Sequence, residues 1–115
     1  TVIGIFEEQF INKKFITVVK PGNQSRKFTH VKDTVKGCYL AWKKNLNKHY
    51  ALSNTKSYSI IQVAKLFSKK IRLIKRRLGE RNKSAAVNKI GSIKISKIKC
   101  SIDLKNYINN FKKNN

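Results

Sequence analysis

The stretch that decides the fold is TVVKPGNQSRKFTHVKDTV, residues 17–35. It completes the β-branched run FITVV (15–19), which predicts a short buried strand. The next residues, PGNQS (21–25), hold the only proline of the chain and predict a turn. Residues 26–31 then predict a second short strand. Asp33 can accept the free amide groups of a first helical turn, so we expect it to be the N-cap of a helix.

The segments next to this stretch predict two helices. Residues 2–11 have apolar side chains at helical spacing, with Glu7 and Glu8 on the solvent side. The helix after Asp33 should run to about Asn45. It should bury one apolar stripe, formed by Val35, Cys38, Tyr39 and Trp42.

The second half of the chain alternates strands and helices. Residues 49–53 predict a strand, and Ser59 and Gln62 form an S-x-x-Q capping box that marks the start of a helix. Residues 70–76 predict another strand, and residues 82–100 are weakly patterned. The last helix is predicted by four apolar positions, Leu104, Tyr107, Ile108 and Phe111.

Length and composition fit one small domain. The chain has 115 residues and is 40% hydrophobic, enough for a modest core. The order of the predicted elements indicates an α/β or α+β fold over residues 1–115, with neither an internal repeat nor a linker, and of the two we expect α/β. The chain contains no methionine and begins at Thr1, so we expect a fragment of a longer protein. No apolar run approaches the length of a membrane span.

The net charge of +22 has two interpretations. A basic surface favours contact with polyanions such as nucleic acids. However, only five of the 27 basic residues are arginine, and the lysines are spread along the chain. Lys, Asn and Ile, which have A/T-rich codons, make up 48 of the 115 residues, so genomic base composition alone could produce much of the bias.

Few residues of the chain are suited to catalysis. It has five acidic residues, two histidines and no Gly-rich phosphate loop. His30 falls within a predicted strand, which favours a packing role over that of a general base. Cys38 and Cys100 are far apart and lack zinc-ligand spacing, so we expect no metal site and two reduced, partly buried thiols.

Two arginines lie where a strand meets a loop. Arg26 begins the second predicted strand, and Arg77 follows the strand over residues 70–76. Two such side chains could hold a diphosphate from opposite sides through bidentate hydrogen bonds. From the residues alone, solvated surface arginines remain the alternative.

Three motifs together resemble the NAD-dependent epimerase/dehydratase family, the extended short-chain dehydrogenases that include UDP-glucose epimerases. Residues 17–35 are similar to its pattern TVVGDGxQxRDFTHVDDxV, and HYALSNTKSYSIIQVAKLF (49–67) to xYNIGxxxSxSIxEVAxxF. KRRLGERNKS (75–84) looks like its RxGD loop followed by a serine. The three occur in the family's order and cover roughly residues 1–88. Lys20, Lys27 and Leu78 depart from the pattern.

The resemblance implies the C-terminal, substrate-binding part of such an enzyme, with short strands and helices and without most of the Rossmann sheet. It implies that Arg26 and Arg77 contact the diphosphate of a nucleotide sugar, which we expect to be a UDP-sugar. It also implies that the backbone at Thr17 and Val19 meets the nucleotide base. The family's NAD-binding loop and its catalytic Ser and Tyr-x-x-x-Lys precede this region. NAD and the catalytic residues would therefore belong to a missing N-terminal part, and the fragment alone would be inactive.

The function expected from the resemblance is the substrate-binding portion of a cytoplasmic nucleotide-sugar epimerase or dehydratase. We expect neither a membrane partner nor a specific nucleic-acid partner. The full-length protein could form a homodimer. Two alternatives remain at this point. One is a small basic nucleic-acid-binding module, although Phe6, Phe28, Trp42 and Phe67 fall on predicted core stripes rather than on a basic stacking surface. The other is a nonfunctional remnant of an epimerase.

Overall fold

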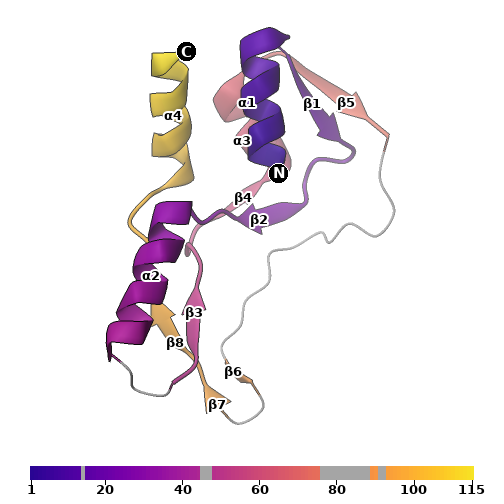
Figure 1. Cartoon of the computed structure of the whole chain (residues 1–115). Coiled ribbons are helices and arrows are strands. Elements are labelled where there is room, and N and C mark those ends of the chain that lie inside the picture. Colours follow the sequence, from indigo (N-terminus) through magenta and orange to yellow (C-terminus); the bar gives the residue numbers. More distant parts are fainter. Residues whose placement is uncertain (14, 45–47, 76–88, 91–92) are drawn as a thin grey trace.

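The computed structural model describes residues 1–13, 15–44, 48–75, 89–90 and 93–115. Within these ranges the chain forms four helices and eight short strands (Figure 1). In chain order they are α1 (Val2–Asn12), β1 (Ile16–Val19), β2 (Ser25–Lys27), α2 (Val31–Lys44), β3 (Tyr50–Leu52), β4 (Ser57–Ser59), α3 (Ile60–Phe67), β5 (Ile71–Ile74), β6 (Lys89–Ile90), β7 (Ile93–Lys94), β8 (Ser96–Ile98) and α4 (Leu104–Asn114).

The described strands pair two by two. β1 and β5 are parallel, with Val18 opposite Leu73, and β3 and β8 are parallel, with Leu52 opposite Ile98. β2 and β4 are antiparallel, with Arg26 opposite Tyr58, and β6 and β7 form a second antiparallel pair. The described part therefore contains four separate two-stranded sheets rather than one continuous sheet.

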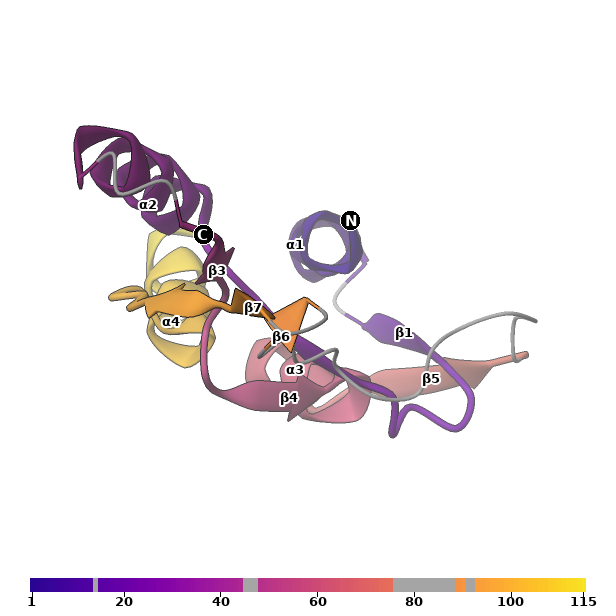
Figure 2. The ribbon, with the colours of Figure 1, turned by 90° about the horizontal axis from the view of Figure 1, so that it is seen from below.

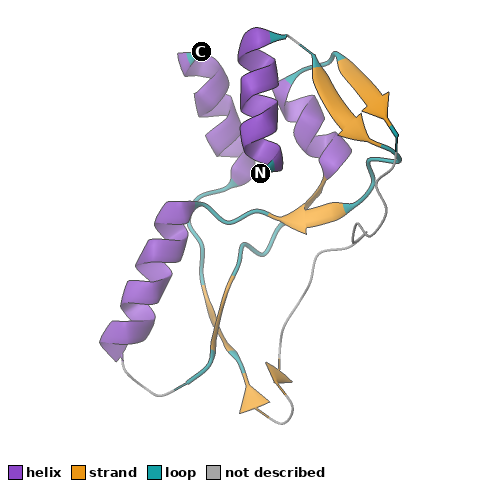
Figure 3. Ribbon diagram, turned by 45° about the vertical axis from the view of Figure 1, so that its right-hand side comes forward, coloured by secondary structure: helices purple, strands orange, loops and turns teal. Residues whose placement is uncertain are grey.

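The hydrophobic core lies where α1 and α3 pack on β1 and where α4 packs on α3 (Figure 3). At its centre Phe67 of α3 makes edge-on contacts with Phe6 of α1 and Phe111 of α4, at centroid distances of 5.9 and 6.1 Å. The predicted capping box starts α3: Ser59 Oγ accepts the Gln62 amide and Gln62 Oε1 accepts the Ser59 amide. The core is completed by other buried side chains, Ile16, Val18, Tyr58, Ile60, Val63, Ala64, Leu104 and Ile108.

The prediction that Asp33 is an N-cap is wrong. α2 begins at Val31, and the strand before it ends at Lys27, earlier than expected. His30 Nδ1 accepts the Lys32 amide at 3.0 Å and so occupies the capping role. Asp33 is buried within the first turn and accepts hydrogen bonds from the chain ahead of α4, as described below.

The carboxylate of Asp33 ties α2 to the segment that leads into α4. Its Oδ1 accepts the amide and the hydroxyl of Ser101, and its Oδ2 accepts the Ile102 amide, all at 2.9–3.1 Å. These contacts lower the pKa of Asp33 below its ordinary value, and the backbone amides of Ile102 and Ser101 have the largest effect. The residue thus joins two elements that are almost seventy positions apart.

The expected buried stripe of α2 is instead exposed. Val35, Cys38, Tyr39 and Trp42 face solvent, and Trp42 is 75% exposed. α2 contacts β3 through its opposite side, where a Cβ at Gly37 would lie 2.2 Å from Leu52 Cδ1. Viewed from below, α2 lies at one end of the molecule, away from α1 and the β1–β5 pair (Figure 2).

The other predicted elements are largely confirmed in type and position, and the α/β fold class is confirmed. The strand β4 was not predicted, and neither were β6, β7 and β8, which lie in the segment that is weakly patterned in sequence. Of the two thiols expected to be partly buried, Cys100 is half-buried but Cys38 is exposed. Within the described ranges, every helix is too short or too polar to cross a bilayer.

Candidate functional site

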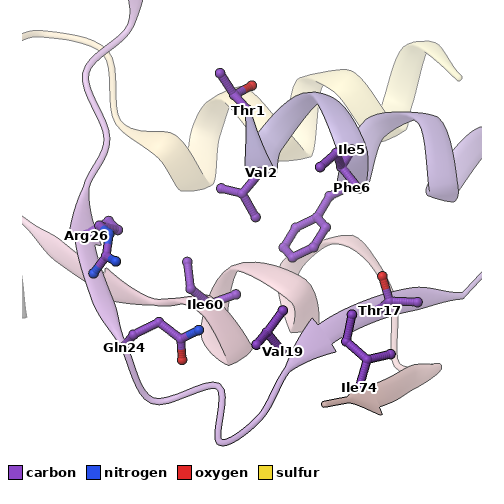
Figure 4. A pocket seen from close by; sticks show the side chains of 10 residues that line it. All are labelled: Thr1, Val2, Ile5, Phe6, Thr17, Val19, Gln24, Arg26, Ile60 and Ile74. Atoms are coloured by element: carbon purple, nitrogen blue, oxygen red, sulfur yellow. The ribbon is translucent and has the colours of Figure 1, made fainter. Parts of the chain in front are cut away.

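Three of the four predicted site residues line one cavity. Thr17 and Val19 of β1 and Arg26 of β2 border a space of about 360 Å³ (Figure 4). Val2 and Phe6 project from α1 toward the start of α3 and form its apolar wall. The remaining lining residues are Thr1, Ile5, Gln24, Ile60 and Ile74.

Arg26 lies between this cavity and a second, larger one. The second cavity, of about 560 Å³, is also lined by Arg26. The Nη1 of Arg26 donates to the Ser25 carbonyl at 2.7 Å, which fixes the guanidinium close to its own strand. Because β2 pairs with β4, the arginine projects from a hydrogen-bonded strand rather than from a loop. One guanidinium therefore borders both spaces.

Thr17 is held by a side-chain contact from α1. The buried Gln9 accepts the Thr17 amide at 3.0 Å and donates to the Thr17 hydroxyl at 2.8 Å. This pair of bonds joins α1 to β1 and gives the cavity a fixed wall. It also occupies the Thr17 amide, so that the backbone donor expected to meet a base at this position is already used.

The turn between β1 and β2 is packed onto α3. Gly22 has φ of +81°, which favours glycine, and a Cβ there would lie 2.9 Å from Val18 Cγ1. The carbonyls of Gly22 and Gln24 accept the amides of Ile61 and Ile60 at 2.9 and 3.0 Å. The turn thereby provides acceptors for the first two amides of α3. These bonds also fix the backbone just before Arg26, which lines the cavity.

Gln24 is a lining residue that our sequence reasoning did not select. It is 4% exposed and lies two positions before Arg26. The glutamine of the family pattern GxQxR falls at this position and was the available signal. The apolar wall from α1 carried no such signal, because apolar residues at helical spacing predict a core and not which part of it is hollow.

The second cavity contains a cluster of polar side chains at one end. Tyr107 donates to Glu7 Oε1 at 2.6 Å, and the His30 ring lies edge-on to Tyr107 at 5.4 Å. The hydrogen bond to Glu7, together with partial burial, raises the pKa of the Tyr107 phenol. Glu7 therefore has a partner and is not simply a solvent-facing residue. The packing role expected for His30 is matched by its ring contact, although it lies at a helix start and not in a strand.

Arg77, the fourth predicted site residue, lies outside the described residues.

The motif Tyr-x-x-x-Lys, which we expected to be missing, does occur as a spacing in this chain, at Tyr39 and Lys43. They lie on the exposed side of α2, with Lys43 Nζ 6.0 Å from the centre of the Tyr39 ring, and neither lines a cavity bordered by Arg26. The spacing here reflects neighbouring positions on a surface helix.

Comparison with known proteins identifies the fold. No protein-family model matches the chain, and no curated protein matches it. Among solved structures, the chain is similar to UDP-glucuronic acid 4-epimerase from Bacillus cereus in complex with NAD, with a TM-score of 0.63 at 18% sequence identity. The match covers 96% of this chain and 39% of that one. The fold is therefore that of part of an epimerase, and the chain spans about two fifths of that protein's length.

The described residues do not form a site that would fit NAD. A dinucleotide site needs glycines whose backbone is open to a pyrophosphate at a helix N-terminus. Gly22 is the glycine with positive φ in the described part, but its surroundings are filled by Val18 and Ile61 and its carbonyl bonds to α3. No step of a mechanism is therefore assigned to NAD on this chain.

Proposed function

We propose that this chain forms the nucleotide-sugar-binding part of an epimerase or dehydratase. The observation that carries the proposal is the convergence of Thr17, Val19 and Arg26 on one cavity, since these residues were selected from the sequence alone. The cavity volume of about 360 Å³ is within the range of small-molecule sites. The similarity in fold to a UDP-glucuronic acid 4-epimerase supports the same class of ligand.

The two cavities suggest how a nucleotide sugar would lie. The diphosphate would contact Arg26, where bidentate, charge-assisted hydrogen bonds are available. The base would occupy the apolar cavity beside β1, and the sugar would extend into the second cavity toward Tyr107. Arg77 would contact the diphosphate from the other side. This part of the protein would bind and orient the ligand, and a portion outside residues 1–115 would supply NAD and the residues for hydride transfer.

The proposal is tested by measuring UDP-glucose binding to the chain by isothermal titration calorimetry. Removing a charged hydrogen-bond donor costs about 1.5–3 kcal/mol, so Arg26→Ala should raise the Kd roughly tenfold to a hundredfold. Arg72→Ala is the matched control. Arg72, on β5, packs over the ring of Phe15 and lines neither cavity.

Equal losses of UDP-glucose affinity in Arg26→Ala and Arg72→Ala would indicate nonspecific binding to a polycation. Unchanged affinity in Arg26→Ala would exclude Arg26 as a ligand-binding residue. Inorganic pyrophosphate serves as a second ligand. If it binds as tightly as UDP-glucose, the apolar cavity contributes nothing and the base is not recognised. The same comparison at high salt separates the site from general attraction to a chain of net charge +22, because diffuse attraction is screened.

A further inference from the structure

The wall of the second cavity includes a half-buried carboxylate. Glu7 of α1 lines this space of about 560 Å³, whereas the adjacent Glu8 is exposed and lines neither cavity. The chain has five acidic residues against 27 basic ones, yet no basic side chain of the described ranges forms an ion pair with Glu7. Its partner is a phenol, since Tyr107 of α4 donates to Oε1 at 2.6 Å. The cavity therefore presents an acidic group in an otherwise strongly basic chain.

Tyr107 holds the carboxylate in one orientation and leaves an acceptor available. The phenol bonds to Glu7 Oε1, and within the described residues Oε2 has no hydrogen-bond partner. A half-buried carboxylate oxygen without a donor costs free energy, which a hydrogen bond from a ligand hydroxyl would offset. The pKa of the Tyr107 phenol is raised, first by its bond to Glu7, in agreement with a phenol that keeps its proton and donates it. The pair is thus a fixed acceptor for an O–H group.

His30 supplies a donor on the same wall. Its Nδ1 accepts the Lys32 amide at 3.0 Å, so the neutral imidazole carries its proton on Nε2. The ring lies edge-on to Tyr107 at 5.4 Å and also lines the cavity. An acceptor and a donor that both contact one aromatic ring suit a ligand with several hydroxyl groups, because a hydroxyl can donate and accept.

The rest of the wall is largely apolar. Phe28, Ile102 and Leu104 line the same cavity. Pockets for small molecules combine such a lining with a few polar groups that fix the orientation of the ligand. A sugar ring presents C–H groups between its hydroxyls, so it matches a wall that has both kinds of surface.

The cavity is basic in one part and acidic in another. Arg26 and Lys27 line it from β2 and suit a diphosphate, whereas Glu7 is held by Tyr107 from α4. A sugar that extends from Arg26 toward Tyr107 brings its far carbon atoms to the carboxylate. A hydroxyl on these atoms donates to Oε2. The carboxylate of a sugar acid meets a like charge instead, in a partly buried site where repulsion is weakly screened.

We propose that the Glu7–Tyr107 pair selects a neutral sugar on the nucleotide and disfavours a sugar acid. Glu7 contacts the sugar, and Tyr107 is a positioning residue that acts through Glu7. The inference rests on the proposed function and deepens it by naming the class of sugar. It does not take the sugar from the epimerase of similar fold, which is named for a uronic acid and is 18% identical. Net charge alone predicts the opposite order, because a chain of +22 attracts the more anionic ligand more strongly.

The test compares UDP, UDP-glucose and UDP-glucuronate by isothermal titration calorimetry on the 115-residue chain. UDP-glucose should bind at least about tenfold more tightly than UDP-glucuronate, in spite of its smaller charge. Glu7→Gln removes the charge and keeps the shape, so it should reduce this ratio at least about fivefold and leave the Kd of UDP within about twofold. Tyr107→Phe releases the carboxylate, so it should weaken the binding of UDP-glucose but not that of UDP.

Glu8→Gln is the matched control for Glu7→Gln, because it makes the same change of charge on the same helix at an exposed position outside both cavities. Tyr39→Phe, on the exposed side of α2, is the control for Tyr107→Phe. Both controls should leave the ratio unchanged. The inference is overturned if UDP binds but UDP-glucuronate binds as tightly as UDP-glucose, if Glu7→Gln leaves the ratio unchanged, or if Glu8→Gln changes it equally. If UDP itself does not bind, the proposed function fails and this inference fails with it.

Discussion

Replacing Phe67 with alanine is the most informative test of the core. Phe67 is 1% exposed and makes edge-on contacts with Phe6 and Phe111, besides a tilted contact with Phe10 at 6.4 Å. Through these contacts Phe67 joins α3 to both α1 and α4. If the core lies where the structure places it, this substitution should cost more than any change on α2.

The expected magnitude follows from burial and ring contacts. Burying a phenylalanine contributes about 1.5–3 kcal/mol, and each edge-on aromatic pair adds about 0.5–1.5 kcal/mol. We expect Phe67→Ala to lower the free energy of unfolding by about 4 kcal/mol, within the range of about 3–5 kcal/mol known for such changes. This is a large share of the roughly 5–15 kcal/mol available to a small domain.

The assay is urea unfolding followed by circular dichroism. With a slope of about 2 kcal/mol per molar urea, the midpoint should fall by about 2 M. Phe67→Leu keeps most of the volume and should cost less than about 1.5 kcal/mol, so it remains measurable if the alanine variant does not fold. Trp42→Ala is the control: this ring is 75% exposed, and its removal should change the stability by no more than about 0.5 kcal/mol. A shift for Trp42→Ala as large as that for Phe67→Ala would refute the placement of the core.

Two further predictions concern polar contacts. The pKa of Asp33 is lowered in the folded protein, so its contribution to stability is present above about pH 4 and is lost as the pH falls through the folded value. Asp33→Asn should therefore reduce the urea midpoint at pH 7 and weaken its dependence on pH between 4 and 2; an unchanged midpoint at pH 7 would show that the bonds to Ser101 and Ile102 do not matter. Ser59→Ala removes the N-cap of α3 and should cost about 1 kcal/mol by the same assay, with Ser59→Gly costing less; equal effects would argue against a cap.

The sequence was informative where local chemistry decides the structure. The capping box at Ser59 and Gln62 depends on residues three apart, and it fixed the start of α3 correctly. The first helix follows from the spacing of its apolar residues, and the strand over residues 16–19 follows from its β-branched run. Both signals depend only on neighbouring positions in the sequence. The resemblance in residues 17–35 selected Arg26, Thr17 and Val19, which do line one cavity.

Long-range contacts were beyond such reasoning. Asp33 before an apolar run has the pattern of a cap, but its carboxylate bonds to Ser101 and Ile102, nearly seventy residues away. Nothing local distinguishes a carboxylate that caps its own helix from one that binds another segment. Likewise, β8 is a strand because it pairs with β3, and its own three residues carry no strong strand signal.

The α2 stripe shows where periodicity stops being informative. Val35, Tyr39 and Trp42 recur at helical spacing, and this pattern predicts a buried stripe. Periodicity does not identify the surface that covers a stripe, or whether that surface belongs to the same 115 residues. In the structure the stripe is exposed, on the side of α2 that faces away from β3. The expectation of burial is therefore wrong within the described residues: α2 packs on β3 through the side that carries Gly37, and apolar spacing alone does not tell which side of a helix has a neighbour.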